Sequence, residues 1–111
     1  EYKAQITELT DISQGLVYYS MTIQNQNISQ IGKQGIRQLL ASFKVIDEKY
    51  SERLENYDLN PSQSLFCILY HIGKSDEEVM QILQYSLSNI RVRKSRIKSD
   101  TGAESFDDII R

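Results

Sequence analysis

Apolar residues recur three and four positions apart along the first part of the chain. In residues 2–23 this spacing joins six of them: Ile6, Leu9, Ile12, Leu16, Tyr19 and Ile23. Such spacing puts one apolar stripe along a helix, so we predict a helix over this range. Gly15 is a candidate break in that helix because glycine is a poor helix former.

A polar interval at residues 24–27 is typical of a loop, and the helical spacing resumes after it. The second predicted helix covers residues 28–54. Its stripe consists of Ile28, Ile31, Ile36, Leu39, Leu40, Phe43, Ile46, Tyr50 and Leu54. Gly32 and Gly35 each weaken a helix by up to about 1 kcal/mol, so we expect a kink or a boundary there.

Helix-capping patterns divide the second half of the chain. The motif Asn60-Pro61-Ser62-Gln63 predicts a helix that begins at Pro61 and stops at Gly73. A capping box, Ser75-Asp76-Glu77-Glu78, opens the next helix and puts three carboxylates at the positive end of its dipole.

Two further capping patterns follow. Only about two residues separate the end of that helix from Ser86, a third N-cap candidate, so the next helix should cross it steeply. We interpret Thr101-Gly102-Ala103-Glu104 as a fourth capping box that opens a last short helix.

No alternating strand pattern interrupts these helices, so the sequence predicts an all-α fold. We divide it into two parts. Residues 1–57 form an N-terminal helical region for packing or dimerisation, and residues 58–111 form a helical module with a short last helix. The two roles of the N-terminal region stay open as equal alternatives.

The net charge of −2 and the pI of about 5.4 argue against a nucleic-acid partner until the distribution of charge is considered. Residues 88–98 carry five positive charges and no acid, which leaves −7 for the rest of the chain. A polyanion responds to local charge within a Debye length of about 8 Å, so this segment is a candidate binding surface.

The predicted helix at residues 87–99 has two different sides. Ile90 and Ile97 lie seven apart and face the core, with Arg93 and Lys94 beside them. At about 100° per residue, the opposite side holds Ser88, Arg91, Val92, Ser95, Arg96 and Ser99. We expect Arg93 and Lys94 to lay their stems on the core or to pair with an acid.

Three stretches follow a known pattern: Leu59-Asn60 with Gln63, then residues 73–80, then residues 86–91. In these stretches residues 59–101 resemble the LuxR/GerE-type helix-turn-helix, the output domain of many response regulators. Met80 departs from the alanine usual in that family and implies looser helix packing, and Asp100-Thr101 replace a basic residue and a leucine.

The resemblance implies that the helix at about 87–99 enters the major groove of double-stranded DNA. Arg91, Val92 and Ser95 would then face base edges, and Ser88, Arg96 and Lys98 would meet phosphates. The helical wheel agrees except for Lys98, which lies at the flank. We therefore predict a sequence-specific transcriptional regulator, and the alternative is a protein-protein interaction module built on a degenerate helix-turn-helix. RNA or an anionic membrane would also suit a cationic patch.

Other chemistries have little support in the sequence. Cys67, in an apolar run, predicts a buried reduced thiol and hence a cytoplasmic protein. His71, the one histidine, is expected to cap carbonyls or to pack, and a Cys67 and His71 pair lacks a third group to orient it. We expect no enzymatic activity, no metal and no cofactor.

The longest apolar stretch, residues 65–70, is far shorter than the roughly 20 residues that span a bilayer. The chain begins with Glu1 rather than methionine, which favours a piece of a longer protein.

Overall fold

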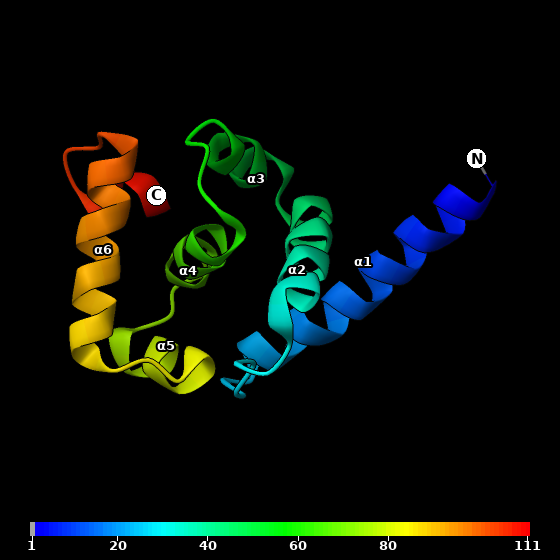
Figure 1. Ribbon diagram of the computed structural model, residues 1–111, viewed down its shortest axis with the longest axis horizontal. Coiled ribbons are helices and arrows are strands. Elements are labelled where there is room, and N and C mark those ends of the chain that lie inside the picture. Colours follow the sequence, from blue (N-terminus) through cyan, green and yellow to red (C-terminus); the bar gives the residue numbers. More distant parts are fainter. Residues whose placement is uncertain (1) are drawn as a thin grey trace.

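The computed structural model describes the backbone of residues 2–111 and the side chains from residue 9 onward. Over that range it contains seven helices and no strand, so the all-α prediction is confirmed (Figure 1). Among these residues no helix is both long and apolar enough to cross a membrane.

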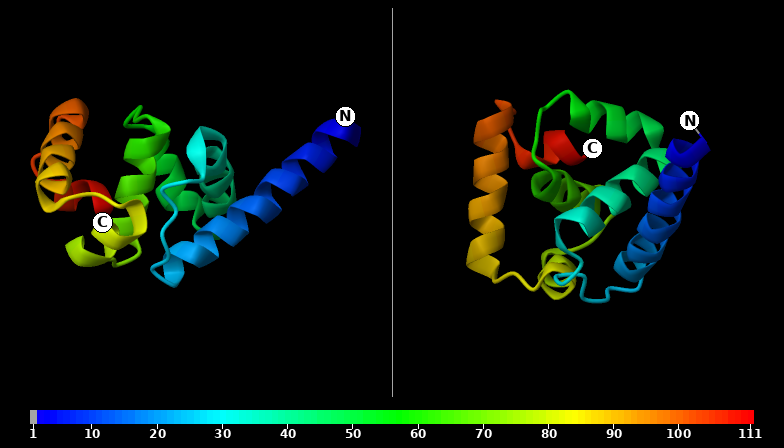
Figure 2. Two further views of the ribbon diagram at one scale, coloured as in Figure 1. Left: turned by 60° about the horizontal axis from the view of Figure 1, so that its bottom comes forward. Right: turned by 45° about the vertical axis from the view of Figure 1, so that its right-hand side comes forward.

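The helices are arranged largely in chain order, from the first at one end of the molecule to the sixth at the other (Figure 1). α1 (Tyr2–Ile23) and α2 (Gly32–Ile46) run in opposite directions at one end, and the N-terminal part of α1 projects away from the rest (Figure 1). α3 (Glu48–Glu55), α4 (Pro61–His71) and α5 (Asp76–Leu83) form the middle. α6 (Leu87–Thr101) lies at the opposite edge from α1, and the short α7 (Phe106–Ile110) packs between α6 and α4 (Figure 2).

Gly15 does not break α1, contrary to the expectation. It is buried where α1 crosses α2, and a Cβ atom placed on it would lie 1.9 Å from the carbonyl oxygen of Gln38. The absence of a side chain therefore allows the two backbones to approach closely. Whether a glycine ends a helix or permits such a contact depends on a partner helix that is distant in sequence.

α2 covers only one side of the stripe predicted for α1. Ile12 and Tyr19 are half-buried, whereas Leu9, Leu16 and Ile23 are 65%, 44% and 51% exposed. The side chain of Ile6, also assigned to this stripe, lies outside the described residues. α1 is thus an amphipathic helix with apolar residues left in solvent.

The second predicted helix is two helices, and the prediction of one helix over residues 28–54 was wrong. Asp47 leaves the helical conformation with φ −141° and ψ 82°, and its carboxylate accepts a hydrogen bond from the Tyr50 backbone N–H at 3.1 Å. Asp47 is therefore the N-cap of α3. The boundary expected near the glycines is confirmed, since α2 begins at Gly32.

The capping predictions for the second half are confirmed at three helices. Asn60 with Gln63 and Ser75 with Glu78 form complete capping boxes at the starts of α4 and α5. Ser86 accepts from the Asn89 N–H at the start of α6.

The fourth capping prediction was wrong. Thr101 is the last residue of α6, and its hydroxyl donates to the carbonyl of Ile97 rather than capping a new helix. Gly102 ends α6 in the left-handed conformation, and Ser105 caps α7 instead. A Thr-x-x-Glu pattern does not distinguish a helix start from a helix end that contains the threonine.

One hydrophobic core runs through both predicted parts of the chain. From residues 28–54 it includes Ile28, Leu39, Phe43, Tyr50 and Leu54, and from the second half Leu65, Phe66, Cys67, Ile68, Leu69, Val79, Ile82, Leu83, Ile90, Ile97 and Ile109. The backbone N–H of Ile28 also donates to the carbonyl of Ile82 at 2.9 Å. α2 and α3 therefore pack directly on the second half of the chain.

Candidate nucleic-acid interface

α6 is presented at the edge of the molecule by a tight joint with α5. Gln84 takes the left-handed conformation at φ 59° and ends α5, and α6 is capped by Ser86 two residues later. The short joint turns the chain steeply, so α6 stands upright beside α4 and α5 (Figure 1). Ile90 and Ile97, which are 0% and 1% exposed, hold it to the core.

All six residues assigned to DNA contact are exposed on α6: Ser88, Arg91, Val92, Ser95, Arg96 and Lys98. Val92, a large apolar residue, is 55% exposed. None of the ion pairs among the described residues involves Arg91, Arg96 or Lys98. In this structure α6 therefore offers a free surface of three cations, two serines and a valine, which we call the α6 outer face.

No protein-family model matches this chain, and no curated protein or solved structure does either. The resemblance to LuxR/GerE-type regulators therefore depends on the residue pattern alone and stays a prediction.

Arg93 and Lys94 lie on the inner side of α6, as expected. The Nε of Arg93 donates to Asn89 at 2.9 Å, and its guanidinium carbon lies 4.2 Å from the centre of the Tyr85 ring. Lys94 donates to Asp76 at 2.8 Å and lies 4.6 Å from the centre of the Tyr70 ring. These two cations have internal partners, so the helix carries two kinds of basic residue.

Asp76 introduces a negative charge at the margin of the α6 outer face. The hydrogen bond from Lys94, and then that from the Tyr70 hydroxyl at 2.6 Å, hold the pKa of its carboxyl below the usual 3.8. The charge of Arg91 lowers the pKa further. Asp76 is thus ionised at neutral pH and compensates Lys94, which leaves the outer cations to carry the positive field.

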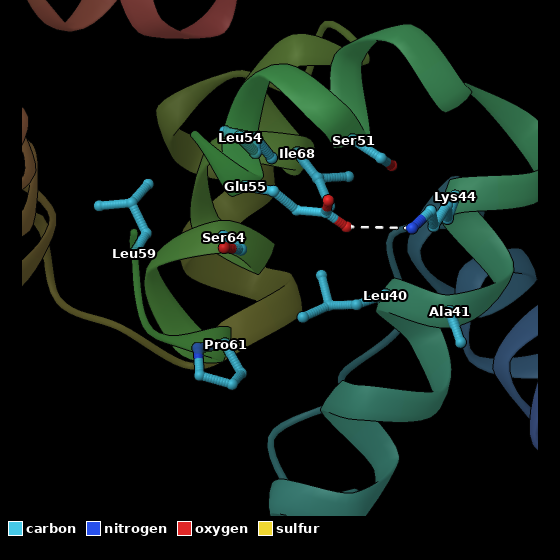
Figure 3. Close-up of a pocket in the computed structure, with 10 residues that line it drawn as sticks. All are labelled: Leu40, Ala41, Lys44, Ser51, Leu54, Glu55, Leu59, Pro61, Ser64 and Ile68. Carbon is cyan, nitrogen blue, oxygen red and sulfur yellow. Dashed lines mark hydrogen bonds and ion pairs between the residues drawn. The ribbon is translucent and has the colours of Figure 1, made fainter. Parts of the chain in front are cut away.

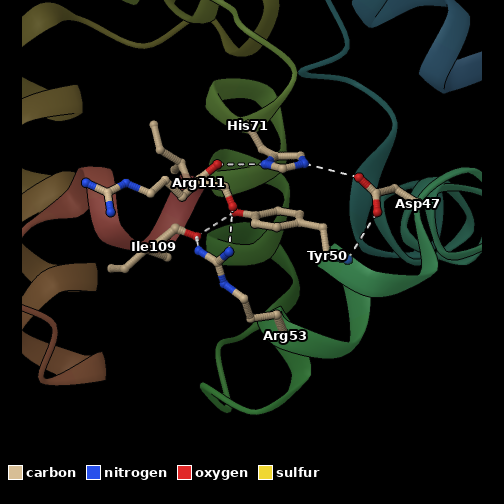
Figure 4. A network of polar contacts seen from close by, with 7 residues as sticks. Asp47, Tyr50, Arg53, His71, Ile109 and Arg111 are labelled. Atoms are coloured by element: carbon tan, nitrogen blue, oxygen red, sulfur yellow. Dashed lines mark hydrogen bonds and ion pairs between the residues drawn. The ribbon is translucent and has the colours of Figure 1, made fainter.

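A polar network joins α3, α4 and α7 on another part of the molecule (Figure 4). The His71 ring stacks on Tyr50 at 3.5 Å, its Nδ1 lies 2.6 Å from the Ile110 carbonyl oxygen, and its Nε2 lies 3.1 Å from the Asp47 carboxylate. The expectation that His71 caps a carbonyl and packs is confirmed. Both partners can only accept, so both bonds form together only when the ring carries two protons.

Tyr50 and Arg53 complete this network, and the sequence analysis missed them. The Tyr50 hydroxyl donates to the Ile109 carbonyl at 2.9 Å, and Arg53 donates to the Asp108 and Ile109 carbonyls at 2.7 and 3.0 Å. No local pattern signals these contacts, since donor and acceptor are more than fifty positions apart. Together they satisfy the carbonyls at the end of α7 and anchor it to the body.

The predicted burial of Cys67 is confirmed. The thiol is 0% exposed, and burial raises its pKa to about 12. Both ring nitrogens of His71, one turn further along α4, are occupied by Asp47 and Ile110. The arrangement therefore provides no activated thiolate at this position.

A hollow of about 280 Å³ lies between α2, α3 and α4, and the sequence did not predict it (Figure 3). Leu40, Leu54 and Ile68 line it, and Lys44 and Glu55 form an ion pair of 3.3 Å across it. Its lining is mostly apolar, and Ser51 and Ser64 supply the remaining polar groups. Because Lys44 and Glu55 neutralise each other, the hollow offers no unpaired charge to a ligand.

Proposed function

We propose that this chain is a sequence-specific DNA-binding transcriptional regulator that inserts α6 into the major groove. The observation that carries the proposal is the α6 outer face, which is cationic, exposed and not ion-paired with any acid that the structure describes. An α-helix about 10 Å wide fits a groove about 12 Å wide. α4 and α5 support α6 from behind in the order that a helix-turn-helix requires.

Within this proposal, Arg91, Val92 and Ser95 read base edges. Arginine donates two parallel hydrogen bonds to guanine O6 and N7, and one such pair discriminates by about 1 to 3 kcal/mol. Val92 offers an apolar contact for a thymine methyl group. Arg91 is the first candidate reader because it lies in the N-terminal half of α6 and takes part in none of the ion pairs between described residues.

Ser88, Arg96 and Lys98 are proposed to meet phosphates and position the helix. Arg96 and Lys98 are the two cations among them, so the logarithm of the binding constant should fall with the logarithm of the salt concentration at a slope of about −1.8 per chain. The net charge of −7 on the rest of the chain repels DNA from the other surfaces, which favours approach through α6.

The alternative is a protein-protein interaction module that uses the same surface for an acidic partner. One observation favours it: the Asp76 carboxylate of α5 lies 2.8 Å from Lys94 of α6 and weakens the local positive field. Binding of duplex DNA at low salt separates the two proposals.

A selection of bound duplexes from a random pool tests the proposal. We expect the Arg91→Ala variant to lose preference at one base position with little loss of non-specific affinity. Arg96→Ala should weaken binding to all sequences and reduce the salt slope by about 0.9.

Arg37→Ala is the matched control, because Arg37 is an exposed arginine on α2. It should leave both the preference and the slope unchanged. The proposal is overturned if the wild-type chain binds no duplex at low salt, or if Arg37→Ala and Arg91→Ala have the same effect.

A further inference from the structure

Exposed apolar side chains gather at the end of the molecule opposite α6. Among the described residues eight large apolar side chains are exposed, and six of them belong to α1 and α2. They are Leu9, Leu16, Val17, Ile23, Val45 and Ile46. A cluster of this kind in a protein is typical of an interaction surface rather than of a solvated one.

On α1 these residues share one face. At about 100° per residue, Leu9, Leu16 and Ile23 fall within a narrow row, and Val17 lies beside it. This row is on the side away from Gly15 and Thr22, which are buried against the body. We call this surface the α1 outer face, and its exposed residues are Leu9, Ser13, Leu16, Val17, Ser20 and Ile23.

The α1 outer face contains no charged residue along four turns. A helix face that stays in water is normally charged or strongly polar, so this composition is unusual for a solvated face. Val45 and Ile46, at the end of α2, are exposed as well. They are not part of this face, because α2 packs on the opposite side of α1, against Gly15.

We propose that two copies of this chain associate through the α1 outer face. In a two-fold dimer the same patch meets itself, so a charge near the axis would face its own copy. A patch of leucine, valine, isoleucine and serine avoids that repulsion and buries apolar surface on both copies. The seven-residue spacing of Leu9, Leu16 and Ile23 is also the spacing at which two helices pack along a seam.

The position of this surface agrees with a dimer that leaves α6 free. α1 and α6 lie at opposite ends of the molecule (Figure 1), and the N-terminal part of α1 projects beyond α2. A partner can therefore reach α1 without contacting α6. The consequence for DNA, two copies of α6 on paired half-sites, rests on the proposed function, whereas the association itself does not.

Sedimentation equilibrium of the full chain tests the association without DNA. We expect the wild-type chain to approach twice its 12.9 kDa mass as its concentration rises through the micromolar range. Leu16→Glu and, separately, Val17→Lys should weaken the dimer by at least about 100-fold, because each substitution occurs twice in a symmetric pair. Both side chains are exposed, so helix content measured by circular dichroism should not change.

Leu87→Glu is the matched control. Leu87 is 39% exposed on α6, outside the α1 outer face, so this variant should dimerise like the wild type. A wild-type chain that stays monomeric overturns the proposal, and so does a folded Leu16→Glu or Val17→Lys variant that dimerises fully.

Disulfide cross-linking gives a second readout and the orientation of the pair. Cys67 is buried, so a cysteine introduced at Ser13 or Ser20 is the only accessible thiol. If the two α1 helices are parallel, each variant should cross-link with itself, and if they are antiparallel, a mixture of the two variants should cross-link. Ser62→Cys replaces an exposed serine of α4 and is the control. This variant should not form a cross-link.

The outcomes separate this inference from the proposed function. A monomer that binds duplex DNA overturns the dimer and leaves the DNA proposal standing. A dimer that binds no duplex supports the association and overturns the DNA proposal.

Discussion

At the residue scale, the five basic side chains of residues 88–98 are not equivalent. Arg93 and Lys94 have aromatic and polar partners inside the protein, whereas Arg91, Arg96 and Lys98 form no ion pair with any side chain from residue 9 onward. A count of basic residues therefore overstates the charge available to a ligand. The difference follows from the angular position of each residue relative to Ile90 and Ile97.

Lys94→Ala should lower stability and leave DNA binding nearly unchanged. The variant loses the ion pair with Asp76 and the contact with the Tyr70 ring, so we expect a loss of about 1 kcal/mol in the free energy of unfolding. Urea denaturation measures this loss. Arg96→Ala is the reciprocal control, and we expect it to keep its stability and to bind DNA more weakly. If instead Arg96→Ala loses stability and Lys94→Ala loses DNA binding, the assignment of Lys94 to the inner side and Arg96 to the outer face is wrong.

Asp47 should make the stability of the fold depend on pH in the acidic range. The hydrogen bond from the Tyr50 N–H, and then the contact with His71, hold the pKa of its carboxyl below the ordinary 3.8. Because the pKa of Asp47 is lower in the folded state than in the unfolded state, its carboxylate stabilises the fold fully when the pH is above the unfolded-state pKa. This stabilisation is lost as the pH falls through the folded-state pKa. Asp47→Ala should cost about 1 kcal/mol at neutral pH, chiefly as a lost N-cap.

The difference between the wild type and Asp47→Ala should therefore shrink as pH falls below about 4. Chemical denaturation between neutral pH and pH 2 measures it. Glu52→Ala removes an exposed acid from the same helix and is the control. The stability difference between the wild type and Glu52→Ala should not shrink as the pH falls. If the stability difference between the wild type and Asp47→Ala stays constant down to the lowest pH, the ionised carboxylate is not what stabilises the start of α3.

At the element scale, the α1 and α2 pair depends on the close approach at Gly15. Gly15→Ala gains up to about 1 kcal/mol of helix propensity, but its Cβ would lie 1.9 Å from the Gln38 carbonyl oxygen. Backbone cannot move aside as a side chain can, so we expect a net loss of about 1 to 3 kcal/mol.

Thermal or urea denaturation checks this prediction. Gln34→Ala, at an exposed position of α2 outside the α1 outer face, is the control and should be neutral or slightly stabilising. A stabilised Gly15→Ala variant would mean that the two helices do not cross as closely as described.

At the scale of the whole molecule, the two proposed surfaces should act together on DNA. The wild-type chain should show about twice the salt slope of Leu16→Glu on a duplex with paired sites, because a dimer makes twice the phosphate contacts. Gel-shift titration across salt concentrations measures both slopes. Equal slopes for the two proteins would show that dimerisation, if present, does not couple to DNA binding.

The starts of α4, α5 and α6 and the two sides of α6 could be predicted because they depend on local chemistry. A capping side chain bonds to a backbone three residues away, and the side of a helix follows from the turn of about 100° per residue. The break at Asp47 was missed because an aspartate within an apolar periodicity resembles an ordinary surface residue. The end of α6 was missed because Thr101 satisfies the capping pattern without serving as a cap.

Long-range contacts set the remaining features. The role of Gly15, the exposed row on α1 and the anchoring of α7 by Tyr50, Arg53 and His71 all involve residues that are far apart along the chain. Periodicity shows that a helix has an apolar side but not how much of that side a neighbour covers. That coverage depends on the packing of the complete chain, and it is what leaves one side of α1 open to a partner.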